Sequence, residues 1–127
     1  MKLAIIIGTR PEIIRLSVII KKCNNMFDLL LIHTGQNWDN KLNDIFFEEL
    51  DIPKPKYFLD CNQGNIGENL GKIIHKTYDI LFKEKPDALL VLGDTNSCLS
   101  VISAKRLKIP IFHMEAGNRC FDFRVPE

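Results

Sequence analysis

Ionisable side chains are dense in the last part of the sequence, residues 109–127. This stretch begins as an apolar run bounded by Pro110, so we expect a short buried strand at residues 109–113. The residues that follow turn polar at once and include His113, Glu115, Arg119, Asp122, Arg124 and Glu127. A strand followed this closely by charged groups is expected to carry functional side chains to one edge of a sheet.

Three earlier apolar runs end in the same way, with a glycine beside polar or ionisable residues. These strand-end segments are Gly8-Thr9-Arg10, His33-Thr34-Gly35-Gln36 and Gly93-Asp94-Thr95. In an open parallel sheet, ligands bind outside the carboxyl ends of the strands, and glycine there allows the backbone to approach a ligand closely. Four such ends at one edge therefore predict a binding site.

The groups at this edge suit proton transfer next to phosphate binding. Three carboxylates can transfer protons: Asp94, Glu115 and Glu127. Two arginines, Arg10 and Arg119, can bind phosphate oxygens. Together these groups fit a sugar-nucleotide substrate. The sequence contains neither GxGxxG nor GxxxxGK[ST], which disfavours NAD binding and P-loop chemistry.

Several of these residues also have an ordinary structural explanation. Asp94 and Thr95 could cap the helix that follows them, because Asp and Thr are favoured N-caps. His33 and His113 are as consistent with structural hydrogen bonding as with acid–base work. Glu12 falls in the first turn of a predicted helix, where its charge favours the helix dipole regardless of function. These alternatives stay open from the sequence alone.

The elements that must position these groups alternate between strand and helix. Apolar runs predict strands at residues 2–7, 27–33, 57–59, 88–92 and 109–113. Helical spacing of apolar residues predicts helices at residues 11 to about 24, 37–50, about 66 to 85, and about 95 to 107. This alternation predicts an α/β fold: a Rossmann-like parallel sheet with right-handed crossovers and helices on both faces.

Composition narrows the class of protein further. The chain has 127 residues, 46% hydrophobic content and a net charge of +1, which fits one domain with a real core and gives no support for nucleic-acid or membrane binding. No segment approaches the roughly 18 apolar residues of a membrane span. The four cysteines lie far apart, which predicts reduced thiols in a cytoplasmic protein and neither a zinc site nor disulfides.

Four segments resemble the successive motifs of one enzyme family. They are Gly8-Thr9-Arg10-Pro11-Glu12, Thr34-Gly35-Gln36, Gly93-Asp94-Thr95 and His113-Met114-Glu115-Ala116-Gly117. In this order they look like the motifs of the non-hydrolysing UDP-N-acetylglucosamine 2-epimerases. The resemblance covers the whole chain and implies that residues 1–127 form the N-terminal half of a glycosyltransferase-B-like fold. A C-terminal nucleotide-binding domain is then expected outside this sequence.

The resemblance implies inversion at C2 of a UDP-N-acetylhexosamine, by elimination and re-addition of UDP without a cofactor or metal. The implied catalytic acids are Asp94, Glu115 and Glu127. The implied substrate-binding residues are Arg10, Arg15, Gln36, His113 and Arg119. The resemblance further implies a homodimer and a place in the synthesis of bacterial surface polysaccharide.

The sequence departs from the family pattern at two positions and in its tail. Arg15 stands where the family commonly has Lys; it keeps the charge but cannot donate a proton at neutral pH. Asn37 replaces a histidine with which some bacterial members form an allosteric substrate site. The tail, residues 117–127, looks more like the branch that epimerises a 2-acetamido-2,6-dideoxy-hexose on the route to UDP-N-acetyl-L-fucosamine.

Two other readings remain. The chain could be a truncated or split-gene fragment without activity, because no second domain is present to hold the uridine; we expect the isolated chain to be inactive for that reason. It could also be the acceptor domain of a glycosyltransferase of the same architecture, although the set of carboxylates fits elimination better.

Overall fold

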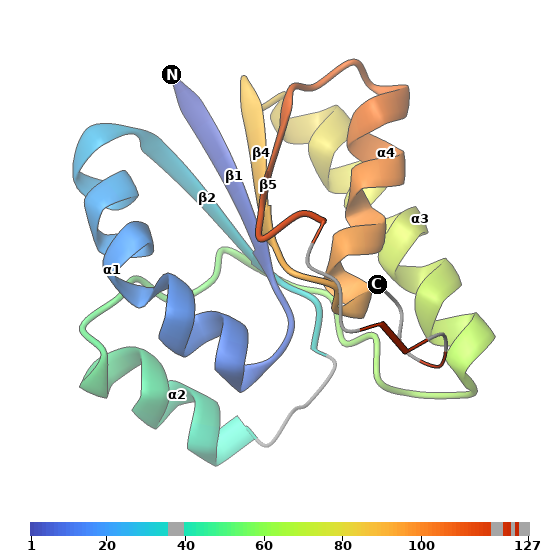
Figure 1. The fold of residues 1–127 in the computed structure, drawn as a ribbon. Helices are drawn as coiled ribbons and strands as arrows, with labels where there is room; N and C mark the ends of the chain where they lie inside the picture. Colours follow the sequence, from blue (N-terminus) through green and yellow to red (C-terminus); the bar gives the residue numbers. More distant parts are fainter. Residues whose placement is uncertain (36–39, 118–120, 123, 125–127) are drawn as a thin grey trace.

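The computed structural model describes residues 1–35, 40–117, 121–122 and 124, and Figure 1 shows their arrangement as a sheet between two layers of helices. The strands are β1 (Lys2–Ile7), β2 (Asp28–His33), β3 (Tyr57–Phe58), β4 (Ala88–Leu92) and β5 (Ile111–Met114). They pair in parallel in the order β3-β2-β1-β4-β5. The strand order therefore reverses direction between β1 and β4, where open α/β sheets bind their ligands.

The helices are α1 (Arg10–Met26), α2 (Asn40–Glu49), α3 (Ile66–Glu84), the 3-10 helix η1 (Asn96–Leu99) and α4 (Ser100–Arg106). Figure 1 shows α1 and α2 on one side of the sheet and α3 and α4 on the other. None of the helices in the described part of the chain is long and apolar enough to cross a membrane. The Rossmann-like α/β prediction is confirmed.

Two apolar clusters explain why the central strands read as continuous apolar runs. One face of β1 contributes Ile5 to the cluster beneath α1, where it meets Ile13 and Leu16. The other face contributes Ile6 to the cluster beneath α3 and α4, which includes Ile73. A strand covered on both faces has no solvent side and needs no alternating polar residues.

Helix α1 buries a different stripe from the one that its most apolar positions suggested. Its buried residues are Ile13, Leu16 and Ile20, together with the carboxylate of Glu12. Ile14 and Val18, whose spacing helped to predict the helix, are 50% and 73% exposed respectively. The helix also runs two residues beyond the predicted end at Asn24.

The prediction of a buried strand at residues 109–113 was wrong in position and in burial. Strand β5 covers Ile111–Met114, and its neighbour within the described sheet is β4 alone. The preceding residues form a turn, with Lys108 at φ +59° and the Ile109 N–H bonded to the Ala104 carbonyl at 2.9 Å. Phe112 is 60% exposed, because an edge strand is covered less than a central one.

Candidate functional site

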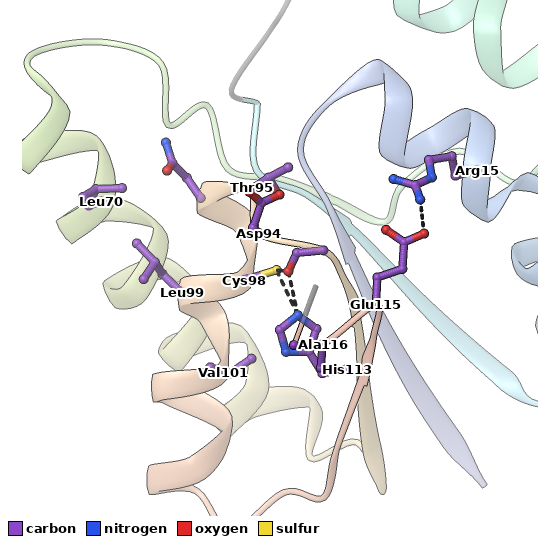
Figure 2. Close-up of a pocket in the computed structure, with 13 residues that line it drawn as sticks. Arg15, Leu70, Asp94, Thr95, Cys98, Leu99, Val101, His113, Glu115 and Ala116 are labelled. Atoms are coloured by element: carbon purple, nitrogen blue, oxygen red, sulfur yellow. Dashed lines mark hydrogen bonds and ion pairs between the residues drawn. The ribbon is translucent and has the colours of Figure 1, made fainter. Parts of the chain in front are cut away.

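A pocket of about 710 Å³ lies at the carboxyl ends of β4 and β5 (Figure 2). Residues from α1, α3, η1, α4, β5 and the loops that follow β4 and β5 line it, among them Arg15, Asp94, Cys98, Leu99, His113 and Glu115. Three of the predicted site residues that carry charge thus share one cavity with a predicted histidine. The cavity is large enough for part of a nucleotide-sized ligand.

A second pocket of about 370 Å³ is lined by the β4–η1 loop and the start of α1. It is lined by Thr9 and Glu12 and shares Arg15, Asp94 and Thr95 with the larger pocket. Asp94 therefore lies at the boundary between the two cavities. A carboxylate in that place can act on a ligand in either one.

The Asp94 side chain forms no hydrogen bond or ion pair with any residue that the structure describes. The backbone presents it: Gly93 turns at φ +67°, and Asp94 follows as an exposed residue. The capping alternative is not supported for Thr95, which occupies the N-cap position of η1 without a side-chain capping bond. Its hydroxyl instead donates to Glu12 at 2.6 Å.

His113 and Cys98 both donate to the Gly93 carbonyl oxygen. The distances are 2.6 Å from His113 Nε2 and 2.9 Å from Cys98 Sγ, and the two donor atoms lie 3.8 Å apart. Since a carbonyl only accepts, Nε2 of His113 carries a proton. Burial raises the pKa of Cys98 to about 11, with a further contribution from the charges of Glu12 and Asp94. The thiol is therefore a protonated donor at neutral pH and a poor nucleophile.

Glu115 forms an ion pair with Arg15, and this pair joins the residue after β5 to helix α1 (Figure 2). Glu115 is in the left-handed region at φ +59°, so the chain turns sharply as it leaves β5. The side chains of Arg15 and Glu115 are 55% and 31% exposed. The pair places a cation and a carboxylate together where solvent or ligand can reach both.

Arg10 is the predicted site residue that lies outside this group. It begins α1, and its guanidinium carbon lies 5.5 Å from the centre of the Phe46 ring. It lines neither of the two pockets. Gln36, Arg119 and Glu127, also predicted for the site, fall outside the described residues, as do Asn37 and Cys120.

The contacts of His33 favour a structural role over acid–base work. It is 1% exposed, its Nδ1 accepts the Gly35 N–H at 2.9 Å, and its ring stacks on Phe58 at 5.0 Å. Burial lowers its pKa to about 4, so the imidazole is neutral at pH 7. His33 shares the sheet edge with Asp94 but does not line the pockets.

Glu12 is the residue whose place in the site the sequence did not reveal. It is 3% exposed, yet its carboxylate touches both strand ends of the switch point. Its Oε2 accepts the N–H groups of Gly8 and Thr9, each at 2.7 Å. Its Oε1 accepts the hydroxyls of Thr95 and Ser97 at 2.6 and 2.7 Å. Two signals were available: its place in the Gly8-Thr9-Arg10-Pro11-Glu12 segment and its position in the first helical turn, and the latter also fitted a simple dipole role.

The described residues contain no group of three or more side chains arranged to hold a metal ion. The free cysteines among them are Cys23, Cys61 and Cys98. Among the described residues the site contains Asp94 without a bonded partner, the Glu115–Arg15 ion pair and the imidazole of His113.

Comparison with known families matches residues 21–127 to UDP-N-acetylglucosamine 2-epimerase. The chain belongs to this family. The UDP-N-acetylglucosamine 2-epimerase of Methanocaldococcus jannaschii is 48% identical over 129 residues, which cover 100% of the chain and 35% of that protein. The UDP-2,3-diacetamido-2,3-dideoxy-D-glucuronate 2-epimerase of Pseudomonas aeruginosa is 45% identical, with 100% of the chain and 37% of that protein covered.

Solved structures agree with the family. The UDP-N-acetylglucosamine 2-epimerase from Rickettsia bellii matches with a TM-score of 0.90 and 54% identity over 99% of the chain and 34% of that protein. The M. jannaschii enzyme in complex with UDP-GlcNAc and UDP matches with a TM-score of 0.91 and 47% identity, over 100% of the chain and 36% of that protein. The chain thus spans about a third of the length of these relatives. The family resemblance and the likeness of this Rossmann-like domain to part of a glycosyltransferase-B-like fold are confirmed; the second domain and the branch toward L-fucosamine stay predictions.

Proposed function

We propose that this chain forms one wall of the site of a UDP-N-acetylhexosamine 2-epimerase, and that C2 is inverted there by elimination and re-addition of UDP. The observation that carries the proposal is the carboxylate of Asp94, which no described residue binds, beside the Glu115–Arg15 pair at the strand-order switch point. Relatives with solved structures support it, since one holds UDP-GlcNAc and UDP.

The chemistry of the substrate explains why such groups are needed. The C2 hydrogen of a UDP-sugar is not next to a carbonyl, so direct abstraction would give an unstabilised carbanion. Elimination avoids this: the C1–O bond to the diphosphate breaks, the C2 proton goes to a carboxylate, and a glycal and UDP result. Re-addition of UDP to C1 and of a proton to the opposite face of C2 gives the epimer. The reaction has no net redox change and so requires no redox cofactor.

Within this proposal the described residues take separable roles. Asp94 is positioned to exchange a proton with the sugar, because nothing else in the described site engages its carboxylate. Arg15 supplies positive charge for the departing diphosphate, and Glu115, the second proposed catalytic acid, forms an ion pair with it. His113 can offer its second ring nitrogen to the ligand while Nε2 holds the Gly93 carbonyl. Arg10, Gln36, Arg119 and the third acid, Glu127, stay as proposed members of the site.

We also propose that residues beyond this sequence complete the site, because the chain spans about a third of its relatives. A second domain would hold the uridine and exclude water from the glycal. The 127-residue chain alone is then inactive. In the whole protein we propose a cytoplasmic homodimer that supplies a sugar nucleotide for surface polysaccharide.

The test grafts residues 1–127 into the M. jannaschii relative in place of the matching segment. The chimera is incubated with UDP-N-acetylglucosamine in D₂O, with the parent enzyme as positive control and the isolated chain in parallel. We expect the C2 epimer, deuterium at C2, and no turnover by the isolated chain. A folded chimera that yields neither epimer nor C2 deuterium contradicts the proposal; turnover by the isolated chain contradicts the need for a second domain. Transfer of the sugar to an added alcohol would indicate a glycosyltransferase.

A further inference from the structure

We propose that Glu12 is a positioning residue: its buried carboxylate ties the β4–η1 loop to the β1–α1 loop and thereby holds Asp94 between the two pockets. This proposal rests on the proposed function for its kinetic consequences, but the positional claim can be tested without it. Three observations support it. Glu12 forms hydrogen bonds to both loops, the Asp94 side chain forms no hydrogen bond or ion pair with the described residues, and Thr95, a partner of Glu12, directly follows Asp94.

The hydrogen bonds of Glu12 connect segments that are more than eighty residues apart in the sequence. Oε2 binds the β1–α1 loop, accepting from Gly8 N–H, Thr9 N–H and, at 3.1 Å, the Thr9 hydroxyl. Oε1 binds the β4–η1 loop through the hydroxyls of Thr95 and Ser97. Each oxygen thus serves one loop. Burying a carboxylate is costly unless donors surround it, and here both oxygens are supplied with donors.

The position of Asp94 depends on the hydrogen bonds of its neighbours. Its own side chain forms no hydrogen bond or ion pair with the described residues. On its amino side, Gly93 is fixed by its N–H bond to the Met114 carbonyl at 3.0 Å and by the donors on its own carbonyl. On its carboxyl side, the Thr95 hydroxyl bonds to Glu12, and the Thr95 carbonyl accepts the Cys98 N–H at 2.9 Å. Loss of the Glu12 contact leaves this side held only by bonds within the β4–η1 segment, with no tie to the β1–α1 loop. A displacement of about 1 Å at a reacting group can cost about a hundredfold in rate.

Dipole stabilisation of α1 alone does not account for this geometry. That role needs a negative charge near the first turn, which an exposed side chain can supply. It does not need the carboxylate to be buried, nor to accept two hydroxyls from another loop. Glu12 does both.

Three buried serines give a matched set of variants. Ser97, Ser100 and Ser103 are 1%, 0% and 1% exposed, and each hydroxyl donates one hydrogen bond of 2.7 Å. Of the three, only Ser97 bonds to Glu12, and none lines either pocket. Ser97→Ala and Ser103→Ala each remove one buried hydroxyl that also contacts a threonine hydroxyl, Thr95 for Ser97 and Thr77 for Ser103, but only Ser97→Ala removes a donor to Glu12. Glu12→Gln is the stronger variant, since it removes the charge.

The kinetic test measures kcat and KM of these variants in the chimera. We expect kcat to fall about 10- to 100-fold for Glu12→Gln and about 3- to 10-fold for Ser97→Ala, with KM within about threefold and Ser103→Ala unchanged. In an Asp94→Asn background, Glu12→Gln should add almost nothing, because the group it positions is already lost. An equal fold-loss in both backgrounds, or equal kcat for Ser97→Ala and Ser103→Ala, overturns the proposal.

A second measurement works on the 127-residue chain and does not need catalysis. The backbone ¹⁵N order parameter of Asp94 is compared between the unsubstituted chain, Ser97→Ala and Ser103→Ala. We expect a lower value in Ser97→Ala and an unchanged value in Ser103→Ala; equal values in the two variants overturn the positional claim. If the unsubstituted chimera lacks epimerase activity, the proposed function fails, and this measurement still decides the role of Glu12.

Discussion

Strand β4 has an aspartate beyond each end, Asp87 before Ala88 and Asp94 after Leu92 and one glycine. Asp87 accepts the backbone N–H of Lys2 at 2.7 Å and so joins β4 to the start of β1. Asp94, at the other end, is bound by no described residue and faces two pockets. The same type of side chain therefore fastens the sheet at one end and is left available at the other.

The surroundings of Glu84, at the fastened end, extend this contrast. Its carboxylate binds Lys2, Lys56 at 2.8 Å and the Tyr57 hydroxyl at 2.5 Å. The hydrogen bond from Lys2, followed by those from Lys56 and Tyr57, lowers the pKa of Glu84 to about 2. Side chains of the protein donate hydrogen bonds to Glu84. No described residue donates one to the side chain of Asp94, so a ligand can. The bonds of Glu84 therefore stabilise the sheet, whereas the Asp94 carboxylate, which no described residue binds, lies in a cavity and is available for function.

The largest effect should separate the two aspartates of β4. We expect Asp94→Asn to lower the rate of C2 proton exchange in the chimera by about 10²- to 10⁴-fold, the range typical of losing an acid–base group. Asp87→Asn is the matched control: it should leave the rate unchanged and lower the melting temperature slightly. Deuterium incorporation at C2 measures both. Equal rates for the two variants would remove Asp94 from the proton transfer.

A smaller effect should appear in stability at the fastened end. We expect Glu84→Gln to lower the free energy of unfolding at pH 7 by about 1–2 kcal/mol, because charged hydrogen bonds are lost and the exposed Lys56 partner contributes little. The folded pKa of Glu84 lies below its ordinary value of 4.5. Its contribution is therefore fully present above about pH 4.5 and is lost as the pH falls toward 2.

Urea denaturation of both proteins across this range gives the measurement. The difference between the original chain and Glu84→Gln should shrink steadily below pH 4.5. Glu49→Gln, at an exposed position of α2, is the control and should show little difference at any pH. A difference that stays constant down to pH 2 would mean that the charge of Glu84 is not what stabilises this end.

The sequence predicts features that depend on neighbouring residues better than features that depend on contacts between residues far apart in the chain. The strands and the polar strand ends were predictable, because apolar runs and the glycines after them are local features. Asp94 and Glu115 were placed at one edge correctly, since all strands of a parallel sheet end there. Their separate states, one unpaired and one bound to Arg15, depend on a contact that spans a hundred residues.

The incorrect and incomplete predictions have the same cause. The exposure of Phe112 depends on what covers β5, which the apolar character of the run does not reveal. The region from Thr95 to Leu107 was predicted as one helix but divides into η1 and α4. The sequence offered only a helix-dipole explanation for Glu12, because its hydroxyl partners lie 83 and 85 residues away. Side-chain bonds between distant loops leave no periodic signal in the sequence.

The smallest effect concerns His33, which shares the sheet edge with Asp94 but is buried and bonded there. Its folded pKa of about 4 lies below the ordinary 6.5, because burial disfavours the charged imidazole. Protonation therefore favours the unfolded chain, and His33 reduces stability progressively as the pH falls from about 6.5 to about 4. A ring-proton NMR titration should place its midpoint near pH 4 in the folded chain and near 6.5 in urea. A folded midpoint near pH 6.5 would mean that water reaches His33 at the end of β2. The contrast between a buried His33 and an exposed Asp94 at the same edge of the sheet would then be wrong.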